Sequence, residues 1–309
     1  MNQSIKHIGL FTSGGDSPGM NAALHAITKS AEVKGIKVSG FRKGYEGLID
    51  GDLVPLKSLE LHKSTHQGGT ILKTAQSKRF LEMEGRKKAL QTLKTNNVDA
   101  IIAIGGDGTF KGPLVFSEIC DIPFIVIPGT IDNDISGTDY TLGFDSALNT
   151  AIQNIDKIKD TAESHNHVFI VEVMGRDSGY IAIHSGLMVG TNVILFPESG
   201  TDFIHLLDKI KNHDSKDAFL VEVSEGDEIG AELVSSKIIE VNRDVDLQFT
   251  KLGHVQRGGN PSALDRTLGI RLGIASVNAL SQGKKNAMVE ILKNQLHLTP
   301  FKEVVKQHQ

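Results

Sequence analysis

The sequence predicts an α/β protein with two doubly wound domains, mainly parallel sheets and a cleft between the domains. Short, nearly continuous apolar runs alternate with longer helical patterns, as expected for strands that are covered on both faces of a parallel sheet. Several of these runs end in glycine-rich turns, where such folds bind ligands. The plan begins twice, near His7 and near His167, and 309 residues are enough for two domains.

The first half of the chain contains three strands that each lead into a turn. The run "HIGLFT" (7–12) predicts a buried strand, followed by a glycine-rich turn and a helix that ends near Gly35. Residues 37–43 predict a second strand. The amphipathic stretch 86–98 predicts a helix before the strand and turn of 99–110, and residues 123–130 predict the next strand.

The second half repeats the pattern. Residues 145–164 have helical spacing, and "HVFIVEVMGRDSGYIAIHSGLM" (167–188) reads as strand, glycine turn and helix. Residues 218–226 predict one more strand. The tail 297–309 predicts a short helix with a frayed end.

Composition excludes several classes of function. The formal net charge of −4 and the pI of about 6.3 give no reason to expect nucleic acid or an anionic membrane as a partner. The single Cys120 cannot form an internal disulfide, which indicates a reducing, cytoplasmic location. We find neither a signal peptide nor an apolar run of membrane-spanning length.

Two glycine-rich turns follow predicted strands. In "TSGGDSPGMN" (12–21), backbone N–H groups at a helix start suit an anion, although a tight turn without a ligand has the same pattern. In "IGGDGTF" (104–110), three glycines flank Asp107. A carboxylate repels phosphate unless a cation lies between them, so Asp107 is a candidate Mg²⁺ ligand; the alternative is a helix cap. The chain has no P-loop and no protein-kinase catalytic loop.

A third turn, "PGTIDND" (128–134), places carboxylates directly after an apolar strand. Phosphoryl transfer to a hydroxyl requires a base that accepts the hydroxyl proton, and Asp132 or Asp134 could serve. An Asx-rich turn that satisfies its own backbone is the alternative. Further along, Arg176, His254 and Arg257 follow strand-like runs and suit an anionic substrate, because arginine binds phosphate bidentately.

Taken together, five blocks resemble the phosphofructokinases in content and order. They are "TSGGDSPGMNAA" (12–23), "GGDGT" (105–109), "PGTIDNDISGTDYTLGFDSA" (128–147), "VEVMGRDSG" (171–179) and "LGHVQRGGNPSALDR" (252–266). The resemblance covers essentially the whole chain. It implies two Rossmann-like domains and transfer of the γ-phosphate of ATP to the 1-hydroxyl of fructose 6-phosphate, with Mg²⁺ as cofactor. The implied nucleotide-binding domain is 1–143 plus about 256–303, and the sugar-phosphate-binding domain is about 144–255 plus the C-terminal tail.

The resemblance also implies roles for residues at matching positions. Asp107 matches the magnesium ligand, Asp132 the base, and Thr130 and Arg176 further catalytic residues. Nucleotide-binding positions are Gly15, Gln76, Ser77, Gly106, Asp107, Gly108 and Thr109. Sugar-phosphate positions are Thr130, Ile131, Asp132, His167, Met174, Gly175, Arg176, Glu225, Gln248, His254 and Arg257. Gly108 and Gly129 leave room for a nucleotide, where the pyrophosphate-using branch typically has Asp and Lys.

This chain departs from the family pattern at three arginine positions, which hold Gln76, His167 and Gln248. In the family the first arginine reaches the transferring phosphate, and the other two come from a neighbouring subunit and hold the sugar 6-phosphate. Loss of two such contacts predicts a cost of roughly 3–6 kcal/mol in substrate binding. The effector pocket is also altered, with His25 and Lys29 at its helix arginine positions.

Three hypotheses follow. The chain is an active ATP-dependent phosphofructokinase with weakened substrate binding; or a regulatory subunit in a hetero-oligomer with a paralogue; or a kinase for a different sugar or nucleoside. An NAD-kinase interpretation is weaker, because that class should end in a strand-rich domain. The family pattern of shared sites predicts a homotetramer.

Overall fold

The computed structural model describes residues 5–165, 167–200, 203–213, 217–241, 243 and 245–306. The chain forms two compact units. The first unit comprises Met1–Ile131, Ile135–Asp145 and Arg257–Gln309, and the second comprises Asp132–Asp134 and Ser146–Gln256.

The first unit is built on a seven-stranded sheet of order β11-β10-β5-β4-β1-β2-β3. Its strands are β1 (His7–Ser13), β2 (Lys37–Phe41), β3 (Leu53–Pro55), β4 (Ala100–Gly105), β5 (Phe124–Pro128), β10 (Ala287–Leu292) and β11 (Gln295–Pro300). The strand pairs from β10 to β2 are parallel, and β3 and β11 pair antiparallel at the edges. The carboxyl ends of β1, β4 and β5 therefore lie at one edge of this sheet, and each runs into a turn that the sequence singled out.

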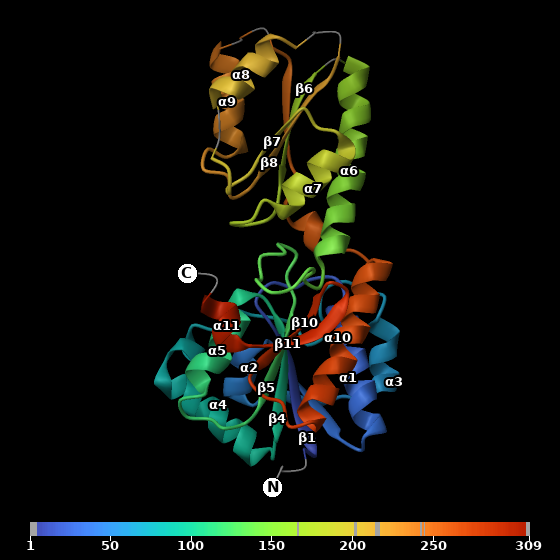
Figure 1. Ribbon diagram of the computed structural model, residues 1–309, viewed down its shortest axis with the longest axis vertical. Helices are drawn as coiled ribbons and strands as arrows, with labels where there is room; N and C mark the ends of the chain where they lie inside the picture. The colour runs from blue at the N-terminus through green and yellow to red at the C-terminus, as the bar shows by residue number, and fades with distance from the viewer. Residues whose placement is uncertain are drawn as a thin grey trace. The chain divides into compact units, whose positions relative to one another are not determined.

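Helices cover both faces of this sheet (Figure 1). They are α1 (Met20–Val33), α3 (Ser58–Leu61) and α10 (Ala263–Ser281) on one face, and α2 (Tyr45–Asp50), α4 (Met83–Thr95), α5 (Asp107–Phe116) and α11 (Phe301–Lys306) on the other. Alternate residues of β4 serve the two cores: Ile102 and Ile104 pack with α1 and α10, whereas Ile101 and Ala103 pack with α4 and α5. This alternation explains why the strand is apolar throughout.

The second unit has a four-stranded parallel sheet of order β7-β8-β6-β9. Its strands are β6 (Val168–Val173), β7 (Val193–Leu195), β8 (Phe219–Ser224) and β9 (Leu247–Lys251). Helices α8 (Phe203–Lys211) and α9 (Ala231–Val241) pack on one face through Leu206, Val234 and Ile238. Helices α6 (Phe144–His165) and α7 (Tyr180–Val189) lie on the other face (Figure 1).

The predicted α/β class with mainly parallel sheets is confirmed. The predicted domain assignment of the C-terminal tail is wrong. The sequence assigned it to the second domain, whereas α11 packs against α5 in the first unit and buries Phe301 and Val304. The segment before α11 is the second strand of the β10–β11 hairpin, which was not predicted. Helix α1 begins at Met20, directly after Gly19, which has φ 100°.

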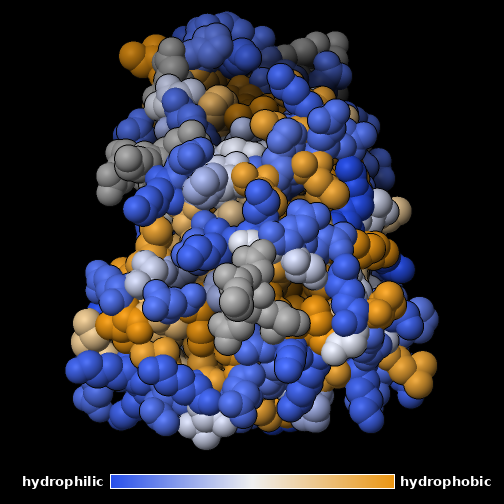
Figure 2. Space-filling model, turned by 60° about the horizontal axis from the view of Figure 1, so that its bottom comes forward, coloured by the Kyte–Doolittle hydropathy of each residue, from blue (hydrophilic) through white to orange (hydrophobic). Residues whose placement is uncertain are grey.

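The face in Figure 2 is mostly hydrophilic, with apolar side chains scattered in small groups. Among the described residues, no helix combines the length and apolar character needed to cross a membrane.

Candidate active site

The turn after β1 lies against Arg257 within the first unit. A Cβ at Gly15 would lie only 2.6 Å from Arg257 Nη1, so glycine is required for the guanidinium to lie where it does. Arg257 Nη1 also donates a long hydrogen bond of 3.5 Å to the Asp16 carbonyl. The structure thus brings together two predicted site residues, Gly15 and Arg257, that are 242 residues apart in the sequence.

The turn after β4 holds Asp107 as the first residue of α5. Its carboxylate does not cap the helix. Among the described residues it pairs with Lys111, whose Nζ lies 2.6 Å from Asp107 Oδ2. Both side chains are partly exposed. Gly108 has no heavy atom within 4 Å of its Cβ position, so the space beside Asp107 is open. This arrangement leaves a carboxylate that can exchange an ammonium partner for a metal ion.

The donor set fits Mg²⁺ through one protein carboxylate. No group of three or more His, Cys, Asp or Glu side chains that could hold a metal occurs in the described part of the chain. Mg²⁺ is commonly held by one or two carboxylates, with waters and substrate phosphates as its other ligands. A single protein ligand, Asp107, is therefore sufficient for a Mg²⁺ site of this kind.

Gln76 and Ser77 differ in their surroundings. Gln76 is exposed and brings no charge to the turns. The Ser77 hydroxyl donates a hydrogen bond to the Glu46 carboxylate and accepts one of 3.1 Å from Phe80 N, in the short 3₁₀ helix Arg79–Leu81. Both of these hydrogen bonds are made within the first unit, and the nucleotide-binding role of Ser77 stays a prediction.

The turn after β5 is buried. Thr130 and Asp132 are 8% and 4% exposed, Ile131 is fully buried, and the Thr130 carbonyl accepts a hydrogen bond of 2.7 Å from Thr141 Oγ1. A Cβ at Gly129 would lie 2.9 Å from Ile104 Cγ2, so packing alone demands glycine there. Gly108, by contrast, faces open space, and it is the better indicator of room for a nucleotide.

In the second unit, the loop after β6 is strongly constrained. Arg176 has φ 52°, a region that non-glycine residues seldom adopt, and Gly175 has φ 154°. The Glu225 carboxylate Oε1 accepts hydrogen bonds from Gly175 N (3.3 Å) and Arg176 N (2.9 Å). Three predicted residues therefore meet here, and the Arg176 side chain is exposed.

Two of the positions without the family arginine also meet, on Asp246. His167 Nε2 lies 3.0 Å from Asp246 Oδ2, and Gln248 Nε2 donates to Asp246 Oδ1 at 3.2 Å. His165 stacks on His167 with ring centroids 5.1 Å apart. A carboxylate thus lies at positions where the resemblance predicted phosphate binding.

The remaining predicted positions form no such cluster. Met174 is buried, and its N–H bonds Gln256; His254 is exposed on the 3₁₀ helix Gly253–Arg257. Thr109 is buried, and its hydroxyl faces the Ser13 carbonyl at 3.5 Å, a long contact. Sequence reasoning missed Lys111 and Gln256, although an Asp and a Lys four residues apart on a helix are a recognisable pair.

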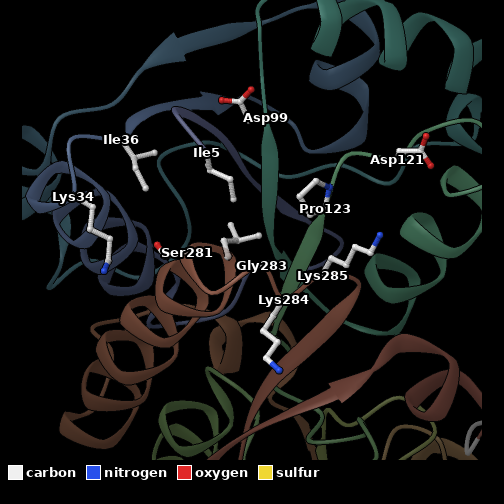
Figure 3. Close-up of a pocket in the computed structure, with 11 residues that line it drawn as sticks. Ile5, Lys34, Ile36, Asp99, Asp121, Pro123, Ser281, Gly283, Lys284 and Lys285 are labelled. Atoms are coloured by element: carbon white, nitrogen blue, oxygen red, sulfur yellow. The ribbon is translucent and has the colours of Figure 1, made fainter. Parts of the chain in front are cut away.

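A cavity of about 730 Å³ opens at the amino-terminal ends of the first sheet's strands (Figure 3). Its charged side chains are Lys34, Lys284, Lys285, Asp99 and Asp121. Asp99 Oδ2 accepts hydrogen bonds from two backbone N–H groups, so part of this charge serves the fold. The cavity includes no predicted site residue and lies at the sheet edge opposite the glycine turns.

Comparison with known proteins agrees over nearly the whole chain. The family model described as Phosphofructokinase matches residues 7–280. The "ATP-dependent 6-phosphofructokinase 1" of Thermus thermophilus is 46% identical over 305 residues, which are 98% of this chain and 94% of the relative. The "ATP-dependent 6-phosphofructokinase 2" of Bacteroides thetaiotaomicron is 42% identical over 306 residues, 98% of this chain and 94% of the relative.

Solved structures give the same result. A phosphofructokinase from Saccharomyces cerevisiae superposes with a TM-score of 0.91 at 34% identity and 97% coverage of this chain. This chain spans only 45% of that yeast chain.

Proposed function

Because this chain belongs to the phosphofructokinase family, we propose that it transfers the γ-phosphate of ATP to the 1-hydroxyl of fructose 6-phosphate, giving fructose 1,6-bisphosphate in glycolysis. The observation that carries the proposal is the similarity over nearly the full chain to relatives named ATP-dependent 6-phosphofructokinase. Retention of Asp107, Asp132 and Arg176 in their expected turns supports it. No observation favours a regulatory subunit or another acceptor.

The proposed chemistry is a direct displacement. The sugar hydroxyl oxygen attacks the γ-phosphorus, its proton passes to the Asp132 carboxylate, and the bond from the γ-phosphorus to the β–γ bridging oxygen breaks to release ADP. Asp107 would hold Mg²⁺, which when bound neutralises charge on the phosphate oxygens. The glycine turns offer backbone N–H groups to the nucleotide phosphates, while Arg176 and Arg257 bind the sugar phosphate.

The substitutions at Gln76, His167 and Gln248 predict a weaker enzyme. Asp246 adds to this, because it bonds both His167 and Gln248 and places a negative charge beside them. A phosphate approaching these side chains would have to compete with that carboxylate. The cytoplasmic location and the homotetramer stay predictions.

A coupled assay with ATP, Mg²⁺ and fructose 6-phosphate tests the function. We expect turnover with a high KM for the sugar phosphate, and loss of turnover in Asp132→Asn. The triple variant Gln76→Arg, His167→Arg and Gln248→Arg should lower that KM by about 10²-fold or more if the three positions carry the defect. Undetectable turnover by folded wild-type protein at millimolar substrate would reject the proposal.

A further inference from the structure

Gln256 is a fully buried amide in an otherwise accessible turn. It lies in the 3₁₀ helix Gly253–Arg257, next to Val255, which is 57% exposed. Gln256 Oε1 accepts a hydrogen bond of 2.9 Å from Met174 N, 82 residues away in the sequence. Gln256 Nε2 has no partner among the described residues. The unpaired Nε2 lowers stability, whereas Oε1 gives the buried Met174 N–H its acceptor, so the hydrogen bond to Met174 N is what the carboxamide contributes here.

The hydrogen bond from Met174 N to Gln256 Oε1 is one of three in this loop. The backbone N–H groups of Met174, Gly175 and Arg176 follow the last residue of β6, and side-chain oxygens accept from all three: Gln256 Oε1 from the first, Glu225 Oε1 from the others. These oxygens hold the backbone of a loop that leaves Arg176 at φ 52°.

The carbonyl side of Arg176 is fixed as well. A Cβ at Gly226 would lie 1.7 Å from the Arg176 carbonyl oxygen, so this oxygen packs directly on a glycine backbone. Arg176 is therefore held at its N–H by Glu225, at its carbonyl by Gly226 and, two residues earlier, by Gln256. A residue with φ near 50° persists only where its surroundings determine it in this way.

We propose that Gln256 is a positioning residue for the sugar phosphate: its buried carboxamide oxygen fixes Met174, and through that backbone it sets the direction of the Arg176 side chain. The inference rests on the proposed function, because it takes fructose 6-phosphate as the ligand of Arg176. It also ties the segment that carries His254 to the loop that carries Arg176, since His254 lies two residues from Gln256.

Two nearly isosteric variants test whether the accepting oxygen of Gln256, rather than the whole carboxamide group, is what matters. Gln256→Met removes the oxygen that accepts from Met174 N, whereas Gln256→Glu keeps an oxygen there and places an acid in a buried site. Asn192→Leu is a matched control, because Asn192 Oδ1 accepts from Leu220 N at 2.8 Å, near the amino end of the neighbouring strand β8. Each full-length variant is measured for fructose 6-phosphate binding by calorimetry, for KM and kcat with both substrates, and for thermal unfolding.

We expect Gln256→Met to weaken fructose 6-phosphate binding and raise its KM by about 10-fold or more, with the KM for ATP unchanged. Gln256→Glu should keep the wild-type affinity although it unfolds at a lower temperature. Asn192→Leu should unfold earlier with both KM values unchanged. If Gln256 had only a structural role, fructose 6-phosphate affinity would follow stability, and whichever Gln256 variant unfolds at the lower temperature would bind the sugar phosphate more weakly.

Equal sugar-phosphate affinity in wild type and Gln256→Met would overturn the positioning role. Equal loss of affinity for both substrates would also overturn it. Wild-type protein that binds fructose 6-phosphate without turnover would reject the proposed function alone, because the binding comparison still decides the role of Gln256. Wild-type protein that does not bind fructose 6-phosphate would reject both.

Discussion

The turn after β4 and the loop after β6 occupy equivalent places in their own units, yet they are built differently. In the first, Asp107 has one exposed ammonium partner, and Gly108 faces open space. In the second, Arg176 has a rare backbone conformation that neighbours fix at its N–H and its carbonyl. The first site is left for its ligand to complete, whereas the second is preorganised before any ligand arrives.

The largest effects should come from removing the charged side chain in each loop, which should impair MgATP use in one case and fructose 6-phosphate use in the other. Asp107→Asn should lower kcat by about 10²–10⁴-fold and weaken MgATP binding, because the metal loses its carboxylate. Arg176→Ala should lower kcat/KM for fructose 6-phosphate by about 10²–10⁴-fold and leave MgATP binding unchanged, because a bidentate phosphate contact is lost. Calorimetry with each ligand and steady-state kinetics measure both.

A shared loss of both ligands in either variant would contradict the division of labour between the loops. Thermal unfolding of each variant serves as the control for folding.

Glycine-to-alanine substitutions should lower stability in the packed loop after β6 but not in the open turn after β4. Gly226→Ala should lower the free energy of unfolding by about 1–3 kcal/mol and raise the KM for fructose 6-phosphate, because the new Cβ would push the Arg176 carbonyl. Gly108→Ala should leave the fold as stable as wild type, or up to about 1 kcal/mol more stable, because alanine favours the helix and meets no atom. Urea unfolding measures both. Equal destabilisation by the two changes would show that the loops do not differ in packing.

Strand β8, which pairs with β6 and leads into Glu225, contains a buried acid that should make stability depend on pH. Burial raises the pKa of Glu222 to about 8, while a hydrogen bond from Ser185 partly opposes the shift. Between about pH 5 and 8 the unfolded chain is ionised and the folded protein keeps the proton, so stability falls as pH rises, by up to about 1.4 kcal/mol per pH unit. Glu222→Gln should remove this slope in urea unfolding at several pH values.

Glu290 in the first unit is the matched comparison. Burial raises its pKa to about 7, and its carboxylate accepts a hydrogen bond of 2.5 Å from Thr299. Glu290→Gln should therefore remove the pH dependence of stability over a narrower pH range than Glu222→Gln does. Parallel pH profiles for wild type and Glu222→Gln would contradict the assignment.

Local patterns predicted most of the fold. A strand buried on both faces, such as β4, has an apolar sequence that needs no knowledge of its neighbours. The β10–β11 hairpin escaped prediction because its turn residues, Lys293 and Asn294, both have positive φ without the Asn-Gly pair that usually signals such a turn. Strand β9 was anticipated only as a strand-like run before His254, because it is short and half exposed.

In the candidate site, too, features formed by neighbouring residues could be predicted, whereas contacts between distant segments could not. Asp107 and its glycines were predictable because they are contiguous, and Lys111 follows at helical spacing. The role of Gln256 was not predictable, because it depends on a contact 82 residues away. The Asp246 bonds to His167 and Gln248 likewise depend on the pairing of β6 with β9.

The smallest expected effect comes from Lys111, and it tests whether the turn after β4 is as open as its geometry indicates. Lys111→Met should lower the free energy of unfolding by no more than about 0.5 kcal/mol, the usual contribution of an exposed (i, i+4) pair. It should also strengthen Mg²⁺ binding without nucleotide by a few-fold, because the ion no longer displaces an ammonium from Asp107. Lys88→Met is the control, since Lys88 and Glu84 form a similar exposed pair on α4, with Nζ and Oε1 2.8 Å apart. Thermal shift with increasing Mg²⁺ measures both variants. The same Mg²⁺ response in both would show that Lys111 does not compete for Asp107, and that the carboxylate is less available than its surroundings suggest.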